Sequence, residues 1–438
     1  MRLKIFSFLL LVGVLGTVEG QQVLAKTDAL KILMERNFDL KIADLNVEIA
    51  DNNTGILNSG YLPTLSANGN INYNIDNSEI VFANGSDTTI NGAESDGRGL
   101  NVNLNYVLFD GFNRKYNISR NRENLTVSQL NAQATLESVL ISFYVTYYGV
   151  AEGQKALNSF KETLEVSKER YNRTQYEFEY GQSTRLDVSN AEIDVNSDSI
   201  NYLNARQSQE ALIRTLNLIV GMDPNEMYLV DTTVNFENMR NKEALFQSLL
   251  TNNTQIQLAE SGVTISQYDN RISKRNLFPT ISLNGGYSNA VNNFAPGNFL
   301  SSRSNNGITY GASFTWNLFD GGASTVASQN ARINIGIQEI ELDRTKQQIV
   351  ADFENAWSVY QNQLFEVEAQ QNNLGANREN FDRTLEKYKL GQVSSLDFRV
   401  AQNNLLQSEL NLITARFAAK VAELEIYRLV GDIQEARF

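Results

Sequence analysis

The sequence predicts a mainly helical protein that also contains membrane-type β-strands, in a chain whose two halves are related by an internal duplication. Short sequence signatures occur twice in the same order, about 210 residues apart. Each copy holds two stretches of alternating apolar and polar residues, the pattern of half-buried strands. Each copy then continues into long stretches without proline, which is typical of very long helices. A repeat of this length is a duplicated structural half, because solenoid repeats are only about 20 to 50 residues long.

The duplication divides the 438 residues of the chain into segments. In chain order we expect a signal peptide (1–20), a first structural repeat (21–221), an inter-repeat belt segment (222–241) and a second structural repeat (242–438). The signal peptide is predicted because Arg2 and Lys4 precede an apolar run, and small residues precede Gln21. The mature chain is therefore expected to be exported.

Composition argues against several classes of function. The formal net charge of −13 would repel the phosphates of DNA or RNA, so no nucleic acid partner is expected. The chain contains no Cys and no His, which removes disulfides, thiolate metal sites and the commonest general base. We therefore expect no cofactor, no metal site and no enzyme activity, although composition alone leaves a carboxylate-only enzyme open. Beyond the N-terminus, no apolar run approaches the roughly 20 residues of a membrane helix.

The predicted strands begin after a proline in each copy. From Leu65 to Ile75 the odd-numbered residues are apolar, Gly or Tyr, and the even-numbered ones are Ser or Asn. A half-buried soluble sheet gives the same period in any single strand, and it is the four matching strands that favour a membrane sheet. Each has about 9 to 11 residues, the length that crosses a bilayer when tilted. The predicted strands are 65–75, 100–108, 281–288 and 308–318, and the polar segments 76–98 and 292–306 are expected to be extracellular loops.

Four strands are too few to close a membrane barrel. Known membrane barrels have at least about eight strands, and an open edge in lipid leaves backbone hydrogen-bonding groups unsatisfied. The chain is therefore expected to oligomerise in outer membrane lipid. Three copies related by cyclic symmetry would supply twelve strands through one repeated interface, so the sequence predicts a homotrimer with a 12-stranded β-barrel.

The remaining residues are predicted to be helical. A helix of about 66 residues measures roughly 100 Å at 1.5 Å per residue, far longer than a typical globular helix. The predicted helices are 28–57, 114–180, 182–221, 242–276, 325–390 and 392–431. The two longest carry a heptad seam, which is typical of helices packed in coiled coils. The seam positions are Leu157, Phe160, Leu164, Ser167, Tyr171, Thr174 and Phe178, with Val367, Gln370, Leu374, Asn377, Phe381, Thr384 and Tyr388 in the second copy.

Short signatures mark the junctions between helices and strands. A proline followed by Thr, an aliphatic residue and Ser lies where a helix gives way to a strand, and Leu-Phe-Asp-Gly lies where a strand gives way to a helix. One Phe-Asp-Gly indicates only a turn with a helix-capping Asp. Two copies in register, each with strands before it and helices after it, are stronger evidence for a repeated junction between strand and helix. The barrel–helix junction residues are Pro63, Phe109, Asp110, Gly111, Pro279, Phe319, Asp320 and Gly321.

Together these features resemble the outer membrane efflux protein family, the TolC-like channels, over essentially the whole mature chain. The resemblance implies a trimeric outer membrane barrel continued by a long α-helical periplasmic barrel. It implies an exit duct of a tripartite efflux or type I secretion system, which passively transports small molecules or proteins from the periplasmic side to the exterior. The implied partners are a periplasmic adaptor protein and an inner-membrane pump or ABC transporter. The residues alone leave one alternative open, a structural coiled-coil protein of the envelope.

The resemblance also assigns roles to the two helix-hairpin tips. They match a periplasmic iris that meets the adaptor, and each contains a Gly that can take the positive φ of a reversal, followed by Ser or Thr that can cap the returning helix. Well-known members carry a gating arginine where this chain has Val393, so we expect packing around Tyr388 to hold the closed state more than a salt bridge. Plain turns and solvated carboxylates are the alternative interpretation. The implied docking residues are Gly181, Gln182, Ser183, Gly391, Gln392, Val393 and Ser394, and the implied iris residues are Asp187, Asp397 and Tyr388.

Overall fold

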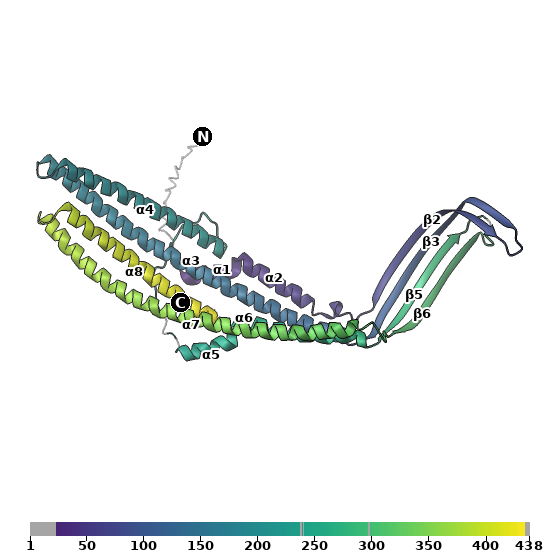
Figure 1. Cartoon of the computed structure of the whole chain (residues 1–438). Helices are drawn as coiled ribbons and strands as arrows, with labels where there is room; N and C mark the ends of the chain where they lie inside the picture. Colours follow the sequence, from purple (N-terminus) through teal and green to yellow (C-terminus); the bar gives the residue numbers. More distant parts are fainter. Residues whose placement is uncertain (1–22, 237–238, 240, 297, 434–438) are drawn as a thin grey trace, which may run out of the picture. The chain divides into compact units, whose positions relative to one another are not determined.

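The computed structural model describes residues 23–236, 239, 241–296 and 298–433 (Figure 1). By its internal contacts the chain forms two compact units. We call them the helical unit (residues up to 41, 136–247 and from 351 on) and the sheet unit (42–135 and 248–350). The signal peptide predicted at 1–20 lies outside the described residues.

Each half of the chain contains two helices, two long strands, one very long helix and one shorter helix, in that order. The first half contains α1 (Lys26–Arg36), α2 (Phe38–Asn52), β2 (Thr64–Val81), β3 (Asp87–Asp110), α3 (Asn113–Glu179) and α4 (Arg185–Val220). The second half contains α5 (Lys242–Asn252), α6 (Thr254–Ser273), β5 (Thr280–Asn293), β6 (Ser302–Thr315), α7 (Ala323–Lys389) and α8 (Ser395–Leu429). The common order is the one expected for the repeats 21–221 and 242–438, whose origin by duplication stays a prediction.

The sheet unit contains a four-stranded antiparallel sheet in the order β2-β3-β5-β6. Its register aligns the predicted apolar positions across strands, because Leu65 pairs with Leu104, and Val102 pairs with Tyr287. The alternate positions pair amides and hydroxyls, as in Ser66 with Asn103. One face of the sheet is therefore apolar and the other is polar, as the alternation predicts.

The strands are longer than predicted. They contain 18, 24, 14 and 14 residues instead of about 9 to 11. Most of the segments expected to be loops, 76–98 and 292–306, belong to strands, and the connections are only 82–86 and 294–301. The prediction was wrong because it ended each strand where the apolar face ends, whereas backbone hydrogen bonds continue between polar residues such as Asn74 and Ser95. At the other end, β6 stops at Thr315, so 316–318 lie outside the strand.

The two very long helices are present as predicted. Both α3 and α7 contain 67 residues and no proline. The predicted seam is confirmed along α7, where all seven positions are half-buried and most neighbouring positions are exposed. On α3, Leu164, Ser167 and Thr174 are buried, while Phe178 at the end of the seam is 40% exposed. Within the described residues, no helix combines the length and hydrophobicity that a membrane crossing needs.

The shorter helices before the strands are each broken in two. The sequence predicts continuous helices at 28–57 and 242–276, but α1 ends just before Asn37 and α5 ends just before Asn253. Both Asn residues have non-helical backbone angles, and both side chains accept hydrogen bonds from the next helix. Asn37 accepts from the N–H of Leu40 at 3.0 Å, and Asn253 accepts from the N–H groups of Gln255 and Ile256 at 3.0 and 3.1 Å. Asn breaks the helix because its amide offers the backbone a competing partner, and it then caps the following helix.

An aromatic run on α3 forms the centre of the apolar core of the helical unit. The hydroxyl of Tyr147 in this run also binds the predicted belt segment. It donates to the carbonyl of Leu24 at 3.0 Å and accepts from the N–H of Asp231 at 3.2 Å. Leu24 belongs to β1 (Val23–Leu24), which pairs in parallel with β4 (Leu229–Val230), and Asp231 directly follows β4. Three residues of the belt segment 222–241, at 237, 238 and 240, lie outside the described residues. The core residues include Leu33, Phe143, Tyr144, Tyr147, Tyr148, Leu216, Phe417 and Leu424.

Candidate functional site

The two helix-hairpin tips reverse direction by the same local geometry. Gly181 has φ +72° and Gly391 has φ +70°, angles that residues with a Cβ rarely adopt. The following glutamines close the turns, since Gln182 N–H donates to the carbonyl of Glu177 at 2.7 Å and Gln392 N–H donates to that of Lys387 at 2.9 Å. The space around both glycines is open, so the positive φ alone requires glycine at these positions.

Both predicted iris aspartates take part in helix capping. Asp187 N–H donates to the hydroxyl of Thr184 at 3.2 Å, and its carboxylate accepts from the N–H of Thr184 at 3.1 Å. Asp397 and Ser394 form the same reciprocal pair at 3.2 and 3.1 Å. Each is a capping box that satisfies N–H groups at the start of the returning helix. The structure thus gives both aspartates a local structural role, and their role in an iris stays a prediction.

These caps should weaken in acid. The pKa of Asp187 lies below its ordinary value of 3.8, mainly because of the hydrogen bond from the Thr184 side chain, and the pKa of Asp397 is lowered in the same way by Ser394. A lowered pKa favours the ionised carboxylate in the folded state, so the stabilisation is complete above the ordinary pKa and is lost as pH falls through the folded pKa. We expect the amides of 180–187 and 390–397 to exchange hydrogen faster below about pH 3.8, after correction for intrinsic rates.

The matched controls are Thr184→Ala and Ser394→Ala, which remove the hydroxyl half of each capping box at every pH. Their tip exchange near neutral pH should resemble that of the wild type in acid. Hydrogen-exchange mass spectrometry measures the exchange rates of the tip amides, with the middle of α3 as the internal reference. Tip protection that stays constant between about pH 5 and about pH 2 would contradict this prediction.

Tyr388, the third predicted iris residue, is packed within the chain behind the second tip. Its ring stacks on Phe398 with centroids 4.9 Å apart, and Phe398 is buried. The guanidinium of Arg173 lies 5.3 Å from the Tyr388 ring centroid and donates to the carbonyl of Lys389 at 3.0 Å. Sequence reasoning missed both Arg173 and Phe398, because neither belongs to the repeated tip signature. The packing expected around Tyr388 is therefore present, and its effect on a closed state stays a prediction.

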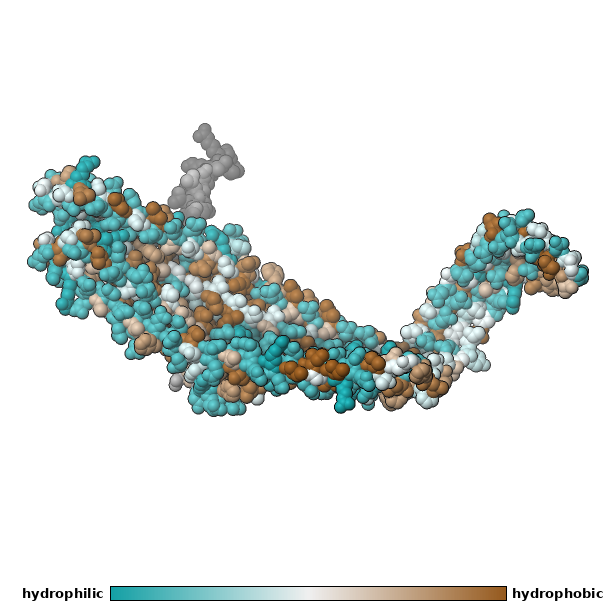
Figure 2. Space-filling view, in the orientation of Figure 1, coloured by the Kyte–Doolittle hydropathy of each residue, from teal (hydrophilic) through white to brown (hydrophobic). Residues whose placement is uncertain are grey.

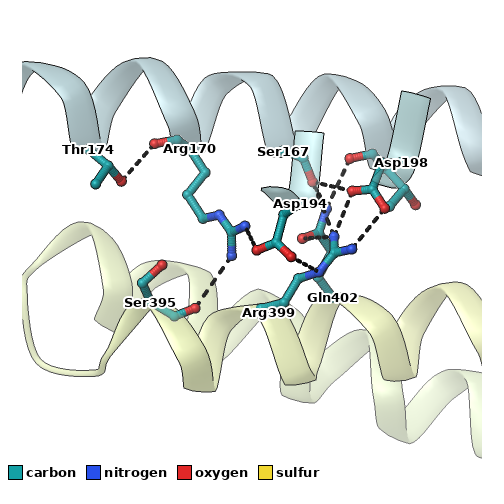
Figure 3. Close-up of polar contacts among 9 residues, drawn as sticks. Ser167, Arg170, Thr174, Asp194, Asp198, Ser395, Arg399 and Gln402 are labelled. Carbon is teal, nitrogen blue, oxygen red and sulfur yellow. Dashed lines mark hydrogen bonds and ion pairs between the residues drawn. The ribbon is translucent and has the colours of Figure 1, made fainter. Parts of the chain in front are cut away.

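Sequence reasoning also missed a group of charged side chains behind the tips (Figure 3). Arg399 of α8 donates to both oxygens of Asp198 of α4, at 2.6 and 2.8 Å. The Ser167 hydroxyl of α3 donates to the same carboxylate at 2.6 Å. Gln402 of α8 donates to Ser167 at 3.1 Å and to the carbonyl of Thr163 at 3.0 Å. Three helices therefore meet at one buried carboxylate, since Asp198 is only 3% exposed.

A second arginine extends this group toward the tips. Arg170 of α3 is 3% exposed and forms a salt bridge with Asp194 of α4. Arg170 also donates to the carbonyl of Ser395 at 3.5 Å, while Arg399 lies 3.4 Å from Asp194. The only feature of the sequence that could have indicated this group was the four-residue spacing of Asp194 and Asp198, which places both side chains on one face of a helix. We call Arg170, Asp194, Asp198 and Arg399 the buried charge network.

In the sheet unit, the predicted junction residues lie at the ends of the strands or between a strand and the next helix. Pro63 and Pro279 directly precede β2 and β5. The carboxylate of Asp110 accepts from the N–H of Arg114 at 3.0 Å, and that of Asp320 accepts from the N–H of Ser324 at 2.9 Å. Each aspartate therefore caps the very long helix that follows its strand.

The surroundings of the two junctions differ. A Cβ on Gly111 would lie 2.6 Å from the carbonyl oxygen of Arg275, whereas Gly321 has open space around it. Phe109 packs on the ring of Phe112, with centroids 5.2 Å apart, while Phe319 is 84% exposed. The first junction is therefore packed and the second is open. Among the described residues, no group of three or more acidic side chains is arranged to hold a metal ion.

Comparisons with known proteins agree with this arrangement. The family model described as outer membrane efflux protein matches residues 29–222 and 245–432. Outer membrane efflux protein BepC of Brucella suis biovar 1 is 23% identical over 424 residues, which cover 95% of this chain and 88% of BepC. The probable efflux pump outer membrane protein TtgC of Pseudomonas putida is 23% identical over 400 residues, which cover 90% of this chain and 80% of TtgC.

The fold is also found among solved structures. The Campylobacter jejuni CmeC outer membrane channel superposes with a TM-score of 0.74 at 17% identity, over 93% of this chain and 85% of that one. The similarity at this level of identity concerns the fold. The match of the family model extends over most of both halves, and the chain belongs to the outer membrane efflux protein family.

Proposed function

We propose that three copies of this chain form a passive exit duct through the outer membrane, as the outermost part of a tripartite efflux or type I secretion system. The family assignment supports an efflux channel of the outer membrane with a TolC-like fold, whose helices extend into the periplasm. Proteins of this family are channels and not enzymes. The trimer, the closed barrel, the passive mechanism and the partners are our proposal.

The observation that carries the proposal is the four-stranded sheet with two outer edges. Its outermost strands, β2 and β6, each pair with one described strand only. One face is apolar and suits lipid. An unpaired edge in lipid would leave backbone hydrogen-bonding groups unsatisfied, at a cost of several kcal/mol for each group. Pairing β6 of one copy with β2 of the next removes every edge. Three copies would then supply twelve strands in a closed ring.

The helices offer a second surface for neighbouring copies. Apolar side chains lie exposed on the helices between hydrophilic ones (Figure 2). On α4 of the helical unit and on α7 of the sheet unit, some of these residues recur every seven positions, the spacing of a coiled-coil seam. They are Leu186, Ile193 and Ile200 on α4, and Val326, Ile333 and Ile340 on α7, all more than half exposed. In a trimer such stripes would pack against helices of the next copy.

The polar face of the sheet supports passive transport of varied cargo. Its side chains are mostly Asn, Ser and Thr, which form hydrogen bonds without fixed charge. Such a lining provides neither a deep specificity pocket nor a source of energy. We therefore place the energy source in an inner-membrane pump or ABC transporter, reached through a periplasmic adaptor at the tips. The docking residues are Gly181, Gln182, Ser183, Gly391, Gln392, Val393 and Ser394.

The iris proposal rests on the two tip aspartates. Asp397 is exposed and Asp187 is half-buried, and the capping hydrogen bonds use only the Oδ2 atom of each. Threefold symmetry would bring six such carboxylates to one end of the tunnel. A ring of like charge on a low-dielectric rim concentrates counter-ions, so cations should be favoured over anions.

The test combines assembly with electrophysiology. The detergent-solubilised protein should have the mass of three chains, and in planar bilayers it should form cation-selective channels that multivalent cations block from the periplasmic side. Asp187→Asn with Asp397→Asn keeps a capping oxygen and removes the charge, and it should weaken both selectivity and block. Thr184→Ala with Ser394→Ala removes the hydroxyl half of each cap and keeps the charge, and it should leave selectivity unchanged. A stable monomer would overturn the assembly, and unaltered selectivity in the asparagine variant would overturn the iris.

A further inference from the structure

We propose that a cavity at the helix end of the sheet binds the carboxylate or phosphate group of a dissolved anionic solute, with Arg275 as its cationic residue. The role of this site in transport rests on the proposed function, because the cavity lines a lumen only in a closed barrel. The site itself lies within one chain, so binding can be measured whether or not the chain forms a channel.

The cavity lies where the strands meet the helices of the sheet unit, and its volume is about 380 Å³. This is within the usual size of a small-molecule site. Thr280 and Thr315 pair across β5 and β6, on the face that also carries the pair of Ser282 and Ser313. The cavity therefore opens on the polar face of the sheet. It is lined by the polar side chains of Asn113, Arg275, Asn276, Thr280, Thr315 and Asn317.

Arg275 gives this cavity a positive charge that no acidic side chain neutralises. Within the described residues, its guanidinium makes no salt bridge and no hydrogen bond. The one acidic residue in the described wall, Asp110, is already paired, because its Oδ2 accepts from the N–H and the Nε of Arg114 at 3.0 and 3.1 Å. The cavity is therefore positive in a chain whose net charge is −13. A guanidinium with all its donors available fits the oxygens of a carboxylate or a phosphate.

The neighbouring polar groups add further donors. The Oδ1 of Asn113 accepts from the amide of Asn117 at 2.9 Å, which leaves the Nδ2 of Asn113 to donate to a ligand. The hydroxyls of Thr280 and Thr315 can donate as well. An anion beside Arg275 would therefore find both a charge and neutral hydrogen-bond donors.

The backbone that carries these groups is held in place. Arg275 belongs to the short helix η2 (Lys274–Leu277), and its carbonyl accepts from the N–H of Phe278 at 3.1 Å. Phe112 has φ +66° and is the one residue other than glycine with a positive φ among the described residues. Its ring packs edge-on against Phe109 and Phe278, with centroids 5.2 and 5.9 Å apart. Strain of this kind persists where the surroundings fix it, and it is common at ligand sites.

The fold itself does not require these polar residues. Four positions before the proline that precedes a strand, the first half of the chain has Ser59 where the second half has Arg275. At the start of the very long helix, the second half has Ala323 where the first half has Asn113. The cation and the amide are thus additions to one junction between strand and helix.

The rest of the polar face would not repel an anion. Its positions within 64–74, 97–105, 280–292 and 305–315 are occupied by Thr, Ser, Asn, Gly and Ala, all without charge. In a trimer, three copies of Arg275 would surround the lumen at the periplasmic end of this neutral lining. They would form a binding level for anionic cargo, separate from the acidic tips.

The binding experiment is calorimetric titration of phenyl phosphate into the detergent-solubilised full chain. The phosphate meets Arg275, and the ring meets Phe278, which also lines the cavity. We expect one molecule per chain, and Arg275→Gln should weaken binding about tenfold or more. Benzylamine has the same ring with a positive charge, so it should not bind. The side chain of Arg275 makes no bond within the described chain, so the thermal midpoint of Arg275→Gln should equal that of the wild type.

Two further variants identify the contact. Lys274→Gln is the matched control, because Lys274 is the exposed neighbour of Arg275 but does not line the cavity, and it should leave the affinity unchanged. Arg275→Lys keeps the charge but not the planar fork, so its affinity should lie between those of the wild type and Arg275→Gln. Equal affinity of the wild type and Arg275→Gln would overturn the site, and so would benzylamine that binds as tightly as phenyl phosphate.

The transport experiment uses planar bilayers of neutral phosphatidylcholine. Phenyl phosphate should reduce the wild-type current reversibly, and more strongly from the extracellular side, because the proposed acidic iris repels anions at the other mouth. Arg275→Gln should abolish this block. Equal block of both proteins would contradict a site in the lumen. Phosphatidylglycerol added to the detergent micelles should not displace phenyl phosphate, and displacement would identify a lipid headgroup site instead.

The outcomes separate this site from the proposed function. A protein that binds phenyl phosphate through Arg275 but forms no channel contradicts the exit duct and leaves the site intact. A channel whose protein binds no phenyl phosphate contradicts the anion site alone.

Discussion

Replacing Gly111 by alanine should destabilise the junction between β3 and α3 by about 2 to 5 kcal/mol, because the new Cβ adds steric overlap to an unfavourable backbone angle. Gly111 has φ +67°, and its Cβ would lie 2.6 Å from the carbonyl oxygen of Arg275 and 3.1 Å from the Cβ of Phe278. A backbone carbonyl in a packed turn cannot move aside cheaply. We expect a lower thermal midpoint and a lower yield of assembled protein in the outer membrane.

Gly321 provides a matched control at the equivalent position of the second half. Its φ of +69° is almost the same, but nothing lies within 4 Å of its Cβ position. Gly321→Ala should therefore cost only the strain of the backbone angle, about 1 to 2 kcal/mol. Equal losses for the two variants would show that the close approach of Arg275 does not decide the effect at Gly111.

Replacing Lys420 by methionine should destabilise the helical unit by about 3 to 5 kcal/mol. Lys420 and Glu423 of α8 are both 0% exposed, and their charged groups lie 2.8 Å apart. The ammonium also donates to the carbonyl of Asn235 at 2.8 Å. Without Lys420, the buried carboxylate of Glu423 loses the ammonium 2.8 Å away, and the carbonyl of Asn235 loses a donor. Urea unfolding followed by circular dichroism measures the loss.

Two comparisons test the cause of that effect. Lys420→Met with Glu423→Leu removes both charges, so it should recover most of the loss in the single variant. Lys168→Met disrupts a Lys–Glu pair of the same spacing with Glu165, but its side chain is 47% exposed, so it should cost less than about 0.5 kcal/mol. If the double variant is no more stable than Lys420→Met, the broken pair between Lys420 and Glu423 is not the reason for the loss.

Local sequence patterns were sufficient to predict several elements of the fold. The period-two alternation after Pro63 predicted which residues of β2 share a face, and the pairing of Leu65 with Leu104 confirms it. The heptad seam predicted the half-buried positions of α7. The glycines at the tips predicted two helix reversals, and both have positive φ. These features depend on backbone angles and periodicities within a few residues, and such information is contained in the local sequence.

Other features depend on which segments meet, and only the tertiary structure decided them. The strands continue past their apolar faces because a neighbouring strand lies there to accept hydrogen bonds. Asn37 breaks a predicted helix where its amide also donates to the carbonyl of Ile219, a residue far away in the sequence. Gly111 and Gly321 share one signature, yet only Gly111 is approached by another part of the chain.

The buried charge network shows this limit most clearly. On the sequence alone, Asp194, Asp198 and Arg399 look like charges on the solvated faces of two polar helices. Asp198 and Arg399 are 201 residues apart in the chain, and packing of α8 against α3 and α4 brings them into contact. Local sequence determined that these segments are helices, and the tip glycines determined where they reverse. Burial, which turns a surface charge into a strong and specific contact, depends on long-range packing, and the tertiary structure alone decides it.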